Sequence, residues 1–75
     1  MNKKDKIENK IKDLNEIRAM YHKDFVEFED KYKEKEISKE ELEKHKINYE
    51  QKREKIRNKI HSLEEKLEKM RTTYK

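Results

Sequence analysis

The chain has no cysteine, glycine, proline or tryptophan among its 75 residues. Without cysteine it can form neither a disulfide framework nor a thiolate metal site. Without glycine and proline it lacks the usual residues of tight β-turns and of the loops that cradle phosphate groups. These absences argue against an all-β or α/β fold and favour a helical one.

Long apolar runs are also missing. No stretch approaches the ~18–20 consecutive apolar residues that a membrane-spanning helix needs. The first residues, Met1 to Asp5, lead into charged sequence and not into the apolar region of a signal peptide. We therefore expect a soluble, cytoplasmic protein that has no membrane partner.

The composition is dominated by charged residues, which make up 53% of the chain, whereas 29% of the residues are hydrophobic. That composition is close to that of disordered chains, but the apolar residues recur at alternating spacings of four and three, as in a heptad repeat. With Ile11 at heptad position a, the a and d positions of the first half are Ile7, Ile11, Leu14, Arg18, Tyr21, Phe25, Phe28 and Tyr32. Those of the second half are Leu42, Lys46, Tyr49, Arg53, Ile56, Ile60, Leu63, Leu67, Met70 and Tyr74. The pattern predicts one helix in each half, with one apolar stripe on each.

The two stripes match in antiparallel order. The expected layers join Tyr32 with Leu42, Phe25 with Tyr49, Leu14 with Ile60, Ile11 with Leu63, and Ile7 with Leu67. The cations of the stripe also meet apolar residues, since Lys46 faces Phe28, and Arg53 faces Tyr21, on whose ring it could stack. A parallel pair of straight helices would place each cation against its own copy. The fold class predicted is therefore all-α, a long antiparallel helical hairpin that forms a two-stranded coiled coil.

Local signals place the turn near Ile37. Ser38 followed by Glu41 is a capping box, and Ile37 with Leu42 forms the hydrophobic staple of the same helix start. We predict a first helix at about 3–35, a turn at about 36–38 and a second helix at about 39–73. An antiparallel dimer of straight helices would make the same layers between two chains, and it remains the alternative.

The sequence offers no catalytic or metal-binding constellation. The three histidines, His22, His45 and His61, fall on different sides of the predicted rod, and His22 is placed opposite Glu50 as a rim hydrogen bond or ion pair. Nucleophilic catalysis needs a base and an orienting group that converge in a cleft, which a two-helix rod does not provide. We expect no catalytic residue, no cofactor and no metal, and hence a protein that is not an enzyme.

We name the contact between the two apolar stripes, formed by the a and d positions, the seam. Outside the seam, the e and b positions of the heptad carry more acidic than basic residues, and the g and c positions carry more basic than acidic residues. On the acidic side, Val26 and Ile47 should be neighbours across the hairpin, and with Ala19 and His22 they form a candidate protein-interaction patch. Scattered apolar surface residues are the ordinary alternative. Because a two-helix rod this polar is marginally stable alone, we expect it to form a homodimer or to dock on another helical protein.

Residues 51–61 hold the densest cations of the chain. The candidate nucleic-acid face consists of Lys10, Lys52, Lys55, Lys59 and Lys66. Of the five cations in residues 51–61, only Lys52, Lys55 and Lys59 share one side, so three phosphate contacts should give weak, salt-sensitive binding. In outline the chain resembles the Rop proteins of plasmids, helical hairpins that dimerise into four-helix bundles and bind RNA. The resemblance covers the whole chain at the level of architecture only, and it implies a dimeric nucleic-acid-binding hairpin as the alternative function.

Overall fold

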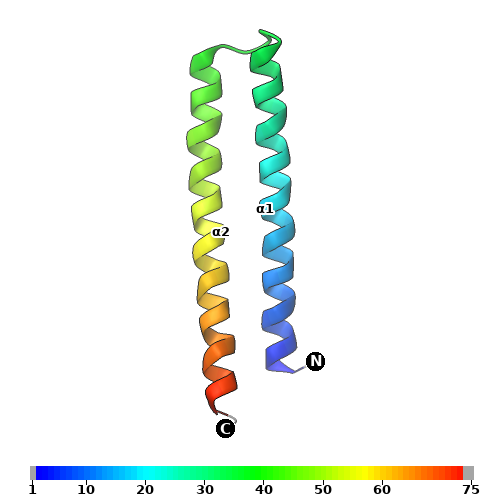
Figure 1. Ribbon diagram of the computed structural model, residues 1–75, viewed down its shortest axis with the longest axis vertical. Coiled ribbons are helices and arrows are strands. Elements are labelled where there is room, and N and C mark those ends of the chain that lie inside the picture. Colours follow the sequence, from blue (N-terminus) through cyan, green and yellow to red (C-terminus); the bar gives the residue numbers. More distant parts are fainter. Residues whose placement is uncertain (1, 74–75) are drawn as a thin grey trace.

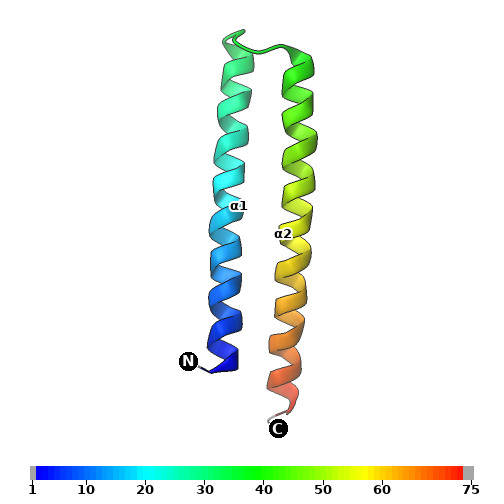
Figure 2. The same ribbon diagram turned by 180° about the vertical axis from the view of Figure 1, so that it is seen from behind.

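The computed structural model describes residues 2–73 and contains two helices, α1 (Lys3–Lys33) and α2 (Lys39–Thr73). The helices lie side by side and run in opposite directions, with the turn at one end of the rod and both chain ends at the other (Figures 1 and 2). The rod measures 58 × 19 × 13 Å. This is an all-α helical hairpin, as the sequence pattern predicts, and its two helices pack against each other.

The first helix is capped at its start by Asn2. The Asn2 side-chain oxygen accepts a hydrogen bond of 2.9 Å from the backbone N–H of Asp5. This bond satisfies one of the backbone donors that a helix start leaves without a partner. The carboxylate of Asp5, in the first turn, also interacts favourably with the positive end of the helix dipole.

The first helix ends at Lys33, two residues before the end expected from the sequence. Lys35 adopts a left-handed backbone conformation with φ 63°. Its N–H donates to the carbonyl of Tyr32 over 3.0 Å, and the N–H of Glu36 donates to the carbonyl of Lys31 over 2.8 Å. These two bonds form a Schellman motif, which normally places glycine where Lys35 stands. The chain therefore leaves the helix through a left-handed residue although it has no glycine.

The second helix starts where the Ser38 and Glu41 pair indicates. The N–H of Glu41 donates to the Ser38 hydroxyl oxygen over 3.2 Å, which is the first bond of the predicted capping box. The second bond differs from that motif, because the Glu41 carboxylate accepts from the Ser38 hydroxyl at 3.5 Å and not from the Ser38 backbone N–H. Ser38 is thus the N-cap of α2, with a reciprocal side-chain contact that is long and weak.

The half of the seam near the chain ends is aliphatic and follows the predicted heptad positions. Among residues 2–71, only Ile7 and Ile56 are buried, with 8% and 6% of their surface exposed. The remaining members of this half are half-buried, namely Ile11, Leu14, Ile60, Leu63, Leu67 and Met70. In a two-helix rod, each seam side chain is covered by the opposite helix and by no third element. Few side chains are therefore fully buried. Tyr74, expected at the end of the seam, lies outside the described residues.

The half near the turn departs from the predicted positions on α2. His45 is half-buried and stacks on Phe28, with ring centroids 3.6 Å apart, whereas Lys46 is exposed. The expected stacking of Arg53 on Tyr21 is also wrong, because the ammonium of Lys52 lies 4.9 Å from the centroid of that ring.

The shift has a geometric cause. A straight α-helix has 3.6 residues per turn, so a strict heptad stripe drifts around it by ~20° per heptad. Over the length of α2, this drift brings the positions just before Lys46 and Arg53 toward α1. Tyr32, expected in a layer with Leu42, retains 39% exposure.

Candidate protein-interaction site

Two grooves run along the half of the rod near the chain ends. The first, which we name the acidic groove, has a volume of about 580 Å³ and is lined by Glu8, Ile11, Lys12, Asn15, Glu16, Ala19, Glu64 and Leu67. The second, the basic groove, has a volume of about 410 Å³ and is lined by Lys10, Asp13, Leu14, Lys59, Ser62 and Leu63. At about 100° per residue, the α1 residues of the two grooves lie on opposite sides of the direction in which Ile11 faces α2. These two grooves therefore lie on opposite sides of the rod.

Each groove has an apolar floor and a charged rim. The floor consists of half-buried seam residues, Ile11 and Leu67 in the acidic groove and Leu14 and Leu63 in the basic groove. The seam therefore remains partly open to solvent on both sides. A partner that covered either floor would bury apolar surface that the hairpin alone leaves wet.

The predicted interaction patch is only partly brought together. Ala19 lines the acidic groove. Val26 and Ile47 are exposed by 37% and 56% of their surface, so both present apolar area to solvent. His22 is not held by Glu50 as expected, because its Nδ1 forms a 3.0 Å hydrogen bond with the hydroxyl of Tyr49. This hydrogen bond holds the His22 ring next to Tyr49, which is a residue of the seam.

The five lysines of the predicted nucleic-acid face are also divided. Lys10 and Lys59 line the same basic groove, one from each helix. Lys55 and Lys66 are exposed on α2. The ammonium of Lys52 lies over the ring of Tyr21, where the aromatic face attracts it.

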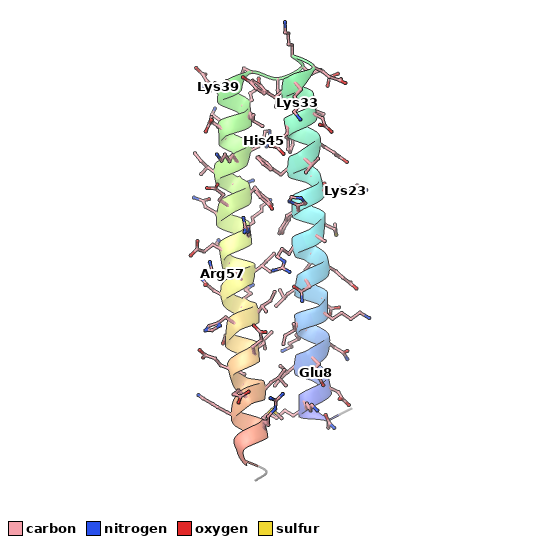
Figure 3. All side chains as sticks on the ribbon, in the orientation of Figure 1. Glu8, Lys23, Lys33, Lys39, His45 and Arg57 are labelled. Atoms are coloured by element: carbon pink, nitrogen blue, oxygen red, sulfur yellow. The ribbon has the colours of Figure 1, made fainter. Side chains whose placement is uncertain are left out.

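Sequence reasoning missed an aromatic cluster near the turn, although it found one of its layers. Phe25 and Tyr49 stack with centroids 4.8 Å apart and an angle of 1° between their planes, which confirms that predicted pair. His45 lies between the helices beside this layer and stacks on Phe28 (Figure 3). The ammonium of Lys31 stands 5.5 Å from the centroid of the Phe28 ring. Pairing residues one position out of the heptad register would have revealed the contact of His45 with Phe28.

Two side-chain contacts of the described residues lie within α2 and do not join the helices. The imidazole of His61 lies 3.1 Å from the carboxylate of Glu65, and the guanidinium of Arg71 lies 3.7 Å from the carboxylate of Glu68, with all four side chains exposed. Such surface pairs are worth ~0–1 kcal/mol.

The described part of the chain has neither a metal-binding cluster nor a membrane-spanning helix. Residues 2–73 contain no group of three or more His, Cys, Asp or Glu side chains placed to hold a metal ion. Within that same range, neither helix has the length and apolar character that crossing a membrane requires.

Comparison with known proteins gave no relative. The chain matches no protein-family model, no curated protein and no solved structure.

Proposed function

We propose that this chain is a non-enzymatic coiled-coil interaction module that associates with copies of itself, in the simplest case as a dimer, or docks on another helical protein through a side of the rod. The cytoplasmic location expected from the sequence belongs to this proposal, and fractionation of cells that express the chain tests it. The observation that carries the proposal is the surface that the hairpin leaves exposed.

The accessible surface of the hairpin is 6683 Å². A compact monomer with its mass of 9.5 kDa would expose about 5,000 Å², so the rod exposes about 1,600 Å² more. A standard interface covers ~800 Å² on each partner. The excess is therefore large enough for stable association.

The thin core points in the same direction. With Ile7 and Ile56 as the only buried side chains among residues 2–71, the hairpin has little apolar burial to offset the entropy of ordering two long helices. Association stabilises the folded form by mass action. The exposed apolar side chains available for it are Ile17, Met20, Val26, Tyr32 and Ile47.

Sedimentation equilibrium over a wide range of protein concentration tests the proposal. We expect a mass above the 9.5 kDa of one chain, rising with concentration, together with a melting temperature that rises in parallel. Replacing Val26 and Ile47 with serine should reduce association while the helical content stays unchanged. A mass of one chain at every concentration, with no capture by a helical partner, would reject the proposal.

A nucleic-acid-binding hairpin is the second candidate, and the placement of Lys10 and Lys59 in one groove favours it. If these two and Lys55 contact phosphates, the affinity should fall with salt with a logarithmic slope of about −2 to −3. Titration of duplex and single-stranded RNA and DNA in gel-shift assays at several salt concentrations measures this slope. Absence of binding at low salt rejects this candidate and leaves the interaction module in place.

A further inference from the structure

The two grooves differ in the sign of their charge. The rim of the acidic groove carries three carboxylates, those of Glu8, Glu16 and Glu64, and one ammonium group. The rim of the basic groove carries the ammonium groups of Lys10 and Lys59 and one carboxylate. Opposite charges therefore border the two sides of the same rod at the same end.

The rim charges are available to a partner. Among the residues that the structure describes, Glu8, Glu64, Lys10 and Lys59 form no ion pair. All four are exposed. A second copy that brought its basic groove against the acidic groove could pair these groups while covering both apolar floors.

A symmetric pairing of like grooves is less favourable. Joining two acidic grooves would bring Glu8 and Glu64 of one copy against the same carboxylates of the other, and like charges placed together across an interface cost free energy. Joining two basic grooves would oppose their lysines in the same way. Pairing unlike grooves avoids both costs.

We infer that copies of this chain associate side to side, with the acidic groove of one rod against the basic groove of the next. The inference rests on the self-association proposed above and specifies its surfaces. Because the two contacting surfaces differ, a pair of rods keeps one free groove at each of its two outer sides, and the assembly does not close after two copies. The excess surface of about 1,600 Å² matches two interfaces of ~800 Å² per rod.

Reversing the charge of one groove at a time tests this arrangement. In the first variant Glu8→Lys is combined with Glu64→Lys, so both sides of the rod become basic. In the second, Lys10→Glu is combined with Lys59→Glu, so both sides become acidic. Each variant alone should associate more weakly than the original chain, on the order of tenfold or more, because unlike grooves are no longer present in one molecule.

An equimolar mixture of the two variants should recover association, since rods with two basic sides can alternate with rods with two acidic sides. Sedimentation at low salt and at about 1 M salt measures the masses, and the high salt should abolish the recovery, because the screening length there is ~3 Å. Lys23→Glu with Lys44→Glu is the matched control. It changes the net charge as much as the second variant does, but its positions lie outside both grooves, and Lys23 points away from α2 (Figure 3). The control should associate like the original chain.

The outcomes separate this inference from the proposed function. Circular dichroism first establishes that each variant keeps its helices, which exposed substitutions should allow. A discrete dimer that persists in the Lys10→Glu and Lys59→Glu variant, or a mixture that recovers no mass, rejects the pairing of unlike grooves and leaves self-association intact. An original chain that stays at 9.5 kDa throughout rejects the pairing of unlike grooves together with self-association, and it leaves docking on another helical protein as the proposed function.

Discussion

Replacing Lys35 with glycine should stabilise the hairpin. Lys35 holds φ at 63° in the Schellman motif that ends α1. The left-handed conformation costs a residue with a Cβ atom ~1–2 kcal/mol, and glycine escapes this cost. Glycine loses more conformational entropy on folding, roughly 0.5–1 kcal/mol. The net gain in the free energy of unfolding should therefore be about 0.5–1 kcal/mol.

Thermal and urea unfolding measure this gain. For a chain of this length, about 0.5–1 kcal/mol corresponds to a rise in melting temperature of roughly 2–8 °C. Lys44→Gly is the matched control, because Lys44 is exposed within α2 and the same replacement there should cost ~1 kcal/mol. The same replacement of lysine by glycine should thus raise the free energy of unfolding at position 35 and lower it at position 44.

The result also distinguishes the hairpin from the alternative of straight helices exchanged between two chains. In a straight helix Lys35 would have helical backbone angles, and glycine there would destabilise it as it does at position 44. A loss of stability in Lys35→Gly would therefore refute the turn within one chain.

Five further substitutions test the turn and the aromatic cluster. Ser38→Ala should lower the free energy of unfolding by ~1 kcal/mol through loss of the N-cap bond, and unchanged melting would show that the hydroxyl bond contributes nothing. Phe25→Ala and Tyr49→Ala should each cost about 2 kcal/mol, at or below the lower end of the range for buried aromatic residues because both rings are half-buried. The double variant should cost less than the two single costs added, by ~0.5–1.5 kcal/mol, and strict additivity would contradict the stacked layer. In urea titrations His45→Ala should lower the free energy of unfolding by about 1 kcal/mol through loss of its ring contact with Phe28. Lys46→Ala should change it by less than ~0.5 kcal/mol, because Lys46 is exposed. Equal effects of the two substitutions would contradict the placement of His45, in preference to Lys46, in the seam.

The fold could be predicted because its determinants are local or periodic. Ser38 and Glu41 mark the start of α2 by a contact between residues three apart, which the sequence displays directly. The pair of Phe25 and Tyr49 follows from matching two apolar stripes about that turn. Both inferences need only helical periodicity and a fixed pivot.

The departures have a different origin. The sequence does not reveal the left-handed conformation of Lys35, because the chain has no glycine to mark that position and the surrounding hydrogen bonds can hold another residue in it. The contact of His45 with Phe28 depends on the phase of a straight helix, which between the buried Ile56 and His45 departs from the heptad approximation by ~30°. The grooves depend on how much of each floor the opposite helix covers, which is a property of the packed pair.

The division of the seam into an aromatic half and an aliphatic half bears on how the hairpin folds. The aromatic contacts lie near the turn, and the hydrogen bond of His22 with Tyr49 joins residues only 27 apart in sequence. Closing a short loop costs less chain entropy than closing the long loop that brings Ile7 against the far end of α2. Nucleation should begin at the aromatic layers and propagate toward the chain ends. Local unfolding should therefore start at the chain ends, in the segment that carries both grooves. A neighbouring rod bound at those grooves would stabilise the part of the molecule that unfolds most readily.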